Sequence, residues 1–146
     1  MAYKDASSTY KETSVKTASQ GQLIVMLYDG AIKQLTRAIE LMELNNSQKK
    51  DPSRYELIGK SIMKTEEILT ELMVSLDFEQ GGEISKNLFS LYTWFNRELV
   101  ESNMSQDLNR VLTVRSMLSD LRNTWSKIAS HAGSQKPEAA GLDIAG

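Results

Sequence analysis

Hydrophobic residues recur with the three- and four-residue spacing of amphipathic helices in four segments of this chain, 20–43, 51–76, 83–102 and 106–131. The periodic apolar positions are Leu23, Leu27, Ala31, Leu35, Ala38 and Met42 in the first; Ile58, Ile62, Ile68, Leu69, Leu72, Met73 and Leu76 in the second; Ile84, Leu88, Leu91, Tyr92, Phe95 and Leu99 in the third; and Leu108, Val111, Leu112, Leu118, Leu121, Trp125 and Ile128 in the fourth. The pattern predicts an all-α chain.

Local signals mark where these helices begin and end. Ser19 and Gln22 have the spacing of a capping box, in which each side chain bonds to the backbone N–H of the other. Asp51 followed by Pro52 is typical of an N-cap and a first helical position. The turn-forming residues 45–47 and 77–82 interrupt the pattern. Because short connections make sequential helices antiparallel, we expect an up-down-up-down four-helix bundle over residues 20–131.

The two ends of the chain lack this periodicity. Residues 1–19 hold many Ser and Thr side chains, but also the apolar Tyr3, Tyr10 and Val15, which favours an N-terminal arm that docks in part. Residues 132–146 combine glycines with a proline and few apolar side chains, so we expect a disordered C-terminal tail.

The first helix carries more apolar positions than one core-facing stripe needs, because residues 23–28 are apolar without a break. Its second face requires another helix, either from this chain or from a partner. Tyr28 and Tyr92 sit in apolar helical runs, where a phenol needs a hydrogen-bonding partner or an exposed edge. Gly30 in mid-helix indicates either a close contact inside the bundle or another backbone that passes nearby.

Composition and charge exclude several classes of function. The 146 residues include no cysteine, so disulfides and thiolate metal sites are excluded and a reducing compartment is favoured. The 17 basic and 19 acidic residues are interspersed, which argues against nucleic acid and membrane surfaces as partners. With no apolar leader and no apolar run long enough to span a bilayer, we expect a cytoplasmic protein.

Candidate chemistry is sparse. The only histidine, His131, lies at the end of the last predicted helix, so neither a di-iron site nor a Ser-His-Asp triad can form, and a phosphotransfer role is disfavoured. The acidic segment 77–83 lacks the glutamate that a calcium loop needs at its twelfth position, where Leu88 stands. It is better explained as a turn in which Gly81 and Gly82 allow positive φ. We therefore expect a protein without cofactor, metal or enzymatic activity.

Two long motifs stand in this chain, QLI-x-MLYDGA at residues 22–31 and LD-x-E-x-GGEI-x-x-NL-x-x-LY at residues 76–92, and a tryptophan follows late in the last helix, Trp125. Together they resemble the FliS family of flagellin export chaperones. The resemblance covers about residues 10–128, and the first interhelical loop and the two ends depart from it.

The resemblance implies a cytoplasmic chaperone that holds the disordered C-terminal segment of flagellin, blocks premature polymerisation and delivers the subunit to the flagellar type III export gate. It also implies an N-terminal arm that covers part of the client site and moves when the client binds. The positions that it offers as partner-binding candidates are Tyr10, Val15, Gln22, Leu23, Met26, Leu27, Tyr28, Gly30, Asn87, Leu88, Leu91 and Tyr92. The match does not separate client contacts from residues that only pack the bundle.

Several alternatives stay open. The extra apolar face fits a self-associating helical adaptor or regulatory bundle without a flagellin client. A flagellar regulatory protein as an additional partner, and the choice between a monomer and a weak dimer, are likewise not decided by the sequence. For the chaperone, we expect the client to wrap around the bundle as several short helices, because one short helix in one groove would barely offset the cost of ordering it.

Overall fold

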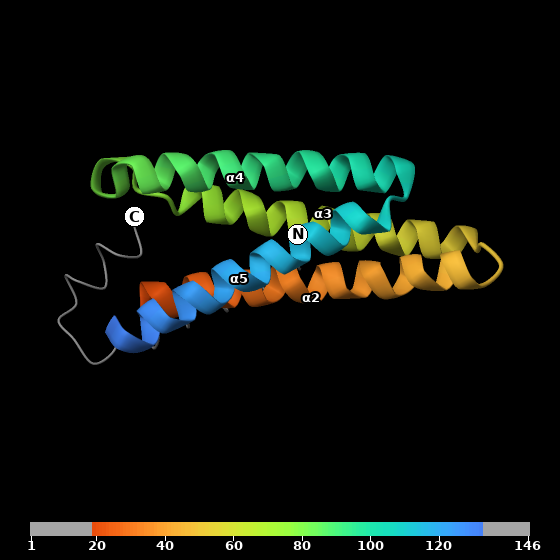
Figure 1. The fold of residues 1–146 in the computed structure, drawn as a ribbon, viewed down its shortest axis with the longest axis horizontal. Coiled ribbons are helices and arrows are strands. Elements are labelled where there is room, and N and C mark those ends of the chain that lie inside the picture. Colours follow the sequence, from red (N-terminus) through yellow and green to blue (C-terminus); the bar gives the residue numbers. More distant parts are fainter. Residues whose placement is uncertain (1–18, 133–146) are drawn as a thin grey trace, which may run out of the picture.

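The computed structural model describes residues 19–132, which form the four helices α2 (Gln20–Ser47), α3 (Pro52–Val74), α4 (Phe78–Ser105) and α5 (Leu108–Ala132) (Figure 1). The all-helical bundle expected from the sequence is confirmed. The predicted arm and tail fall almost wholly outside the described residues.

Each helix packs on two neighbours. Helix α2 contacts α3 and α5 extensively, whereas α4 contacts α3 and α5 less, and α2 and α4 face each other across the diagonal without direct backbone contact. This is the up-down-up-down arrangement that the short connections predict. Figure 1 shows that α4 and α5 meet at the turn between them and diverge toward the opposite end of the bundle. We call these the turn end and the open end.

The predicted start signals form as expected. The backbone N–H of Gln22 donates to Oγ of Ser19 at 3.2 Å, and the backbone N–H of Ser19 donates to Oε1 of Gln22 at 2.9 Å, which completes the capping box. At the start of α3, the Asp51 side chain accepts from the N–H of Ser53 at 3.0 Å, and Pro52 follows the cap. Both caps satisfy N–H groups that have no partner within the helix.

The break predicted over residues 77–82 is a kink inside α4 rather than a separate turn before it. Helix α4 begins at Phe78, not near Glu83, because the Asp77 side chain accepts from the N–H groups of Glu79 and Gln80, both at 3.0 Å, and supports one early helical turn. Gly82 then interrupts the helix with φ of 51°, a conformation that glycine adopts without steric cost.

The core runs along the bundle axis and draws side chains from all four helices. Gly30 is half-buried and lies close to α3, since a methyl group at Gly30 would lie 3.3 Å from Cδ1 of Ile68. The sequence had left two explanations for Gly30, a close contact inside the bundle or another backbone passing nearby, and the structure shows the first. The fully buried large side chains are Tyr28, Leu35, Met42, Ile58, Ile62, Leu69, Leu72, Tyr92, Phe95, Leu99, Val111 and Leu118.

Candidate functional site

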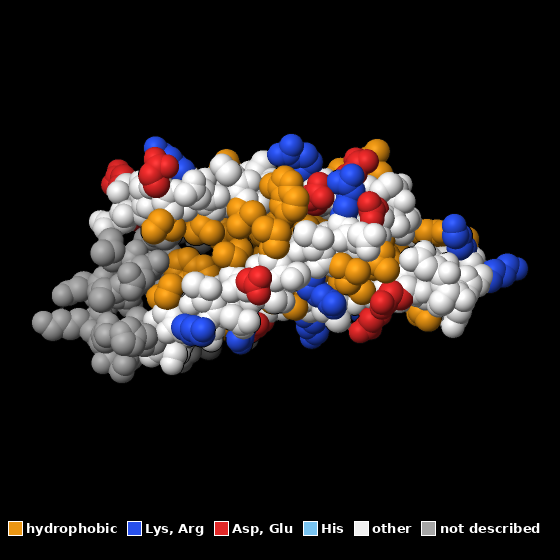
Figure 2. All heavy atoms as spheres, viewed as in Figure 1, with side chains coloured by type: hydrophobic (Ala, Val, Ile, Leu, Met, Phe, Trp, Pro, Cys, Tyr) orange, Lys and Arg blue, Asp and Glu red, His pale blue; other side chains and the backbone are white. Residues whose placement is uncertain are grey.

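A strip of half-buried hydrophobic side chains lies between α4 and α5, and we call it the α4–α5 seam. Its members are Leu91 and Trp94 of α4 and Met117, Leu121 and Ile128 of α5, all packed against the core. Figure 2 shows hydrophobic side chains gathered between these two helices, with charged side chains along the edges. Because the strip keeps part of its apolar surface accessible, it is a candidate docking surface for another polypeptide.

Helical spacing and one ion pair fix which faces line the seam. Arg110 of α5 contacts Oε2 of Glu98 on α4 at 2.8 Å, so these two residues mark the facing sides. The seam residues of α5 follow Arg110 at 7, 11 and 18 positions, and those of α4 precede Glu98 at 4 and 7 positions. Such spacings place residues on one helix face. The strip therefore continues from the ion pair toward the open end.

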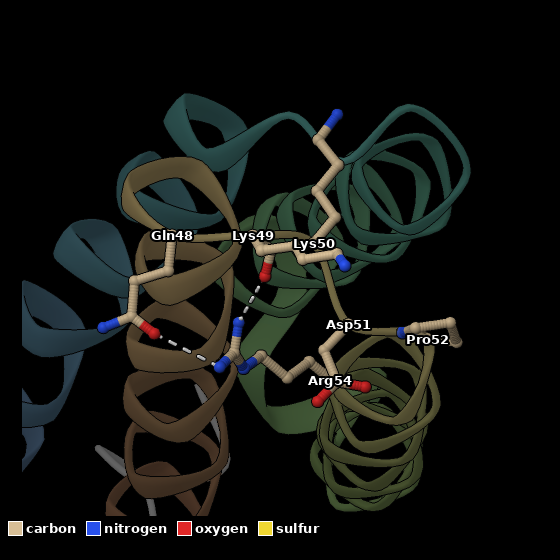
Figure 3. A pocket seen from close by; sticks show the side chains of 6 residues that line it. All are labelled: Gln48, Lys49, Lys50, Asp51, Pro52 and Arg54. Carbon is tan, nitrogen blue, oxygen red and sulfur yellow. Dashed lines mark hydrogen bonds between the residues drawn. The ribbon is translucent and has the colours of Figure 1, made fainter.

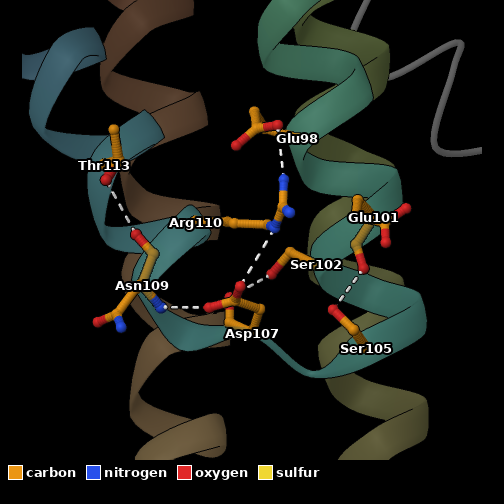
Figure 4. Close-up of polar contacts among 8 residues, drawn as sticks. All are labelled: Glu98, Glu101, Ser102, Ser105, Asp107, Asn109, Arg110 and Thr113. Carbon is orange, nitrogen blue, oxygen red and sulfur yellow. Dashed lines mark hydrogen bonds and ion pairs between the residues drawn. The ribbon is translucent and has the colours of Figure 1, made fainter.

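Polar contacts between α4 and α5 are concentrated at the turn end (Figure 4). Arg110 also bonds to Oδ2 of Asp107 at 3.1 Å, and Oγ of Ser102 donates to the backbone carbonyl of Asp107 at 2.7 Å. Among the residues that the structure describes, the one ion pair that joins α4 to α5 lies here, and the pair of Arg110 with Asp107 joins α5 to the turn before it. The seam residues are apolar, and apolar packing can exchange one apolar partner for another.

Helix α5 is attached to α2 by polar contacts farther toward the open end. Arg122 contacts Oδ1 of Asp29 at 2.8 Å, and Arg115 donates to the hydroxyl of Thr36 at 3.2 Å. The carboxylate of Asp29 beside Arg122 raises the pKa of that guanidinium. Helices α2 and α5 thus form one connected pair, and α4 is the helix with fewer attachments.

Tyr28 and Tyr92 meet in the core across the bundle diagonal. Their hydroxyl groups are hydrogen-bonded to each other, their ring centroids lie 6.5 Å apart, and both side chains are buried. Burial raises the pKa of Tyr92 to about 12, and burial together with the neighbouring Tyr92 raises the pKa of Tyr28 further. The partner that the sequence required for these phenols is therefore the other phenol.

Because these pKa values are raised, the free energy of unfolding should decrease at alkaline pH. In the unfolded chain both phenols ionise near pH 10.0, whereas in the folded chain Tyr92 ionises near 12. The stabilisation is therefore complete below pH 10 and is lost as pH rises from about 10 toward 12, because the unfolded state releases protons that the folded state keeps. Urea titrations between pH 8 and 11 should show this loss, and the double variant Tyr28→Phe, Tyr92→Phe should show a smaller one. If the free energy of unfolding fell equally with pH in both proteins, the raised pKa values would be contradicted.

The residues that the sequence offered as partner-binding candidates lie on several faces. Tyr28, Tyr92 and Leu88 are buried in the core, Gly30 packs on α3, and Gln22 is exposed with its side chain in the capping box. The remaining described candidates keep some accessible surface: Leu23, Met26, Leu27 and Leu91 are half-buried, and Asn87 is exposed. Tyr10 and Val15 lie outside the described residues.

Sequence reasoning did not single out most of the seam. Of its residues, only Leu91 was among the partner-binding candidates. Leu121 and Ile128 were assigned to the core stripe, while Trp94 was not assigned to any face. The signal that could have identified them is their position at the margin of a stripe, where a side chain is half-buried in a bundle.

A polar pocket of about 350 Å³ lies at the connection between α2 and α3 (Figure 3), lined by Gln48, Lys49, Lys50, Asp51, Pro52 and Arg54. The guanidinium of Arg54 bonds to Oε1 of Gln48 and to the carbonyl of Lys49, and it also reaches Oδ1 of Asn45. Its donors stabilise the loop, so we assign this pocket a structural role.

In the described part of the chain, the helices are too polar or too short in their apolar stretches to span a membrane.

Comparisons with known proteins agree with this architecture. A family model described as flagellar protein FliS matches residues 2–132. The flagellar secretion chaperone FliS of Escherichia coli K12 is 35% identical over 117 residues, which cover 80% of each chain. That of Salmonella typhimurium LT2 is 34% identical over 126 residues, 86% of this chain and 87% of the relative. That of Bacillus subtilis 168 is 27% identical over 127 residues, 87% of this chain and 88% of the relative. The chain therefore belongs to the FliS family of flagellar proteins.

Proposed function

We propose that this protein is a chaperone that binds the C-terminal segment of flagellin along the α4–α5 seam. The observation that supports this is an apolar strip between α4 and α5 in which, among the described residues, the ion pair joining the two helices lies at one end. A client helix with apolar residues on one face fits such a strip, since helix-in-groove recognition needs anchors at helical spacing. Asn87 is exposed one turn before Leu91 and offers a polar contact for the client backbone.

The size of the strip favours a client that uses more than one surface. Four apolar anchors at about 2 kcal/mol each give roughly 8 kcal/mol, whereas ordering the segment costs about 2 to 5 and association at least about 4 kcal/mol. A second set of exposed hydrophobic side chains lies on α3 and α4: Met63, Val74, Phe89, Val100 and Met104. These residues support a client that wraps around the bundle in several short pieces.

Binding of this kind explains a role before export. A flagellin segment held on the bundle cannot form the contacts that it makes in a filament, so polymerisation is blocked in the cytoplasm. The complex then delivers the subunit to the flagellar type III export apparatus. In this proposal residues 1–18, with Tyr10 and Val15, cover part of the client site in the free protein and are displaced by the client.

The proposal is tested by calorimetry with C-terminal flagellin peptides shortened from either end. We expect binding to the longest peptide and a stepwise loss of affinity as each client piece is removed. Full affinity of a single short helix would contradict wrapping. Light scattering of the purified chain tests the adaptor alternative, because a dimer that persists at low concentration and is unaffected by the peptide would contradict the chaperone role.

A further inference from the structure

The buried pair of Tyr28 and Tyr92 has a feature that the client proposal does not use. Helices α2 and α4 have no direct backbone contact in the described chain, yet these two side chains join them through the core. Helices α2 and α4 therefore share one buried tyrosine pair inside an apolar core.

The position of the tyrosine pair along α4 determines which part of the α4–α5 seam it can affect. The ion pair of Glu98 with Arg110 attaches α4 at the turn end, and Tyr92 stands almost two turns away from Glu98, toward the open end. Tyr92 also directly follows the seam residue Leu91. Toward the open end, α5 is attached to α2 through Arg122 and Asp29. A link from α4 to α2 at this point therefore also fixes α4 relative to α5.

We propose that the hydrogen bond between Tyr28 and Tyr92 positions α4 against the pair formed by α2 and α5, and so sets the width of the α4–α5 seam. Tyr92 is a positioning residue in this view, since its side chain is buried and does not lie on the surface where a client would dock. A buried hydroxyl that loses its partner either draws in water or moves. Loss of either hydroxyl should therefore let the middle of α4 shift away from α5. The link to client affinity rests on the proposed function, whereas the link to seam width does not.

The seam width can be measured directly because the chain contains no cysteine. Spin labels on Ser90→Cys of α4 and Thr124→Cys of α5, two exposed sites toward the open end, report the distance between the helices. Labels on Glu101→Cys and Thr113→Cys, also exposed, serve as the control pair at the turn end. Pulsed electron resonance on the folded, unliganded protein then gives both distance distributions.

We expect Tyr28→Phe and Tyr92→Phe each to lengthen and broaden the open-end distribution and to leave the turn-end distribution unchanged. Because both variants break the same bond, the double variant should change it no more than either single variant does. Tyr55→Phe, which removes the hydroxyl of a half-buried tyrosine outside the pair, should change neither distribution. Unchanged open-end distances, or additive effects of the two variants, would overturn the proposal.

Client affinity provides a second reading with the C-terminal flagellin peptide as the probe. We expect each single variant to change the dissociation constant by about three- to tenfold, the equivalent of one lost hydrogen bond, while Tyr55→Phe leaves it unchanged. If distances change and affinity does not, the pair sets the seam width but the client does not depend on it. If the unaltered protein fails to bind the peptide, the proposed function fails, and the distances alone decide the positioning role.

Discussion

Replacing Leu121 with glutamate is expected to lower the affinity for the C-terminal flagellin peptide by a factor of about 100 or more. Leu121 is half-buried in the α4–α5 seam, where its outer surface is available to a client. Loss of a buried leucine contact costs about 1.5 to 3 kcal/mol, and a carboxylate covered by an apolar client adds a desolvation penalty. Since about 2.7 kcal/mol corresponds to a factor of 100, calorimetry should resolve the effect.

A matched substitution separates this effect from a general response to added charge. Leu44 is 38% exposed near the end of α2, away from the seam, so Leu44→Glu introduces the same change elsewhere. We expect Leu44→Glu to retain the affinity of the unaltered protein. Circular dichroism should show that both variants remain helical. If both variants kept the affinity of the unaltered protein, or if both lost it equally, the seam would not be the client site.

Replacing Phe95 with alanine is expected to destabilise the bundle by about 3 to 5 kcal/mol. Phe95 has no exposed surface, and its ring lies 6.4 Å from that of Tyr92 and 5.8 Å from that of Trp94, measured between centroids. The substitution removes apolar burial and leaves a cavity in a bundle whose α4 already has few contacts. Urea unfolding followed by circular dichroism measures the change.

The control for Phe95 is another phenylalanine on the same helix. Phe89 is 43% exposed, and its ring has an edge contact with Phe78, which is itself exposed. We expect Phe89→Ala to cost less than about 1.5 kcal/mol, because little buried area is lost there. Similar losses of stability for the two variants would mean that the packing around Phe95 is not the core of the bundle.

The helices and their caps could be predicted because the signals are local. Ser19 and Gln22 lie three residues apart, and Asp51 adjoins Pro52, so no distant contact is needed to recognise either start. The predicted start of α4 was wrong, because Asp77 caps an early helical turn in a segment whose glycines had indicated a break. The sequence shows that glycine permits a break, but not whether the helix ends there or only bends.

The candidate site was less accessible to sequence reasoning. Tyr28 and Tyr92 are 64 residues apart, and their hydrogen bond depends on how the bundle diagonal is packed. Leu121 is half-buried, and the divergence of α4 from α5 (Figure 1) is a property of the assembled helices that has no local signal. The two long motifs lie in α2 and at the start of α4, and buried and accessible positions alternate along each of them.

Hydrogen–deuterium exchange of the free protein and of its complex with the C-terminal flagellin peptide tests directly whether the client lies on the seam. We expect the peptide to slow exchange in α4 around Leu91 and Trp94 and in α5 from Met117 to Ile128, because docking suppresses local opening of both helices. Slower exchange confined to α2 and α3, with α4 and α5 unchanged, would contradict binding along the α4–α5 seam.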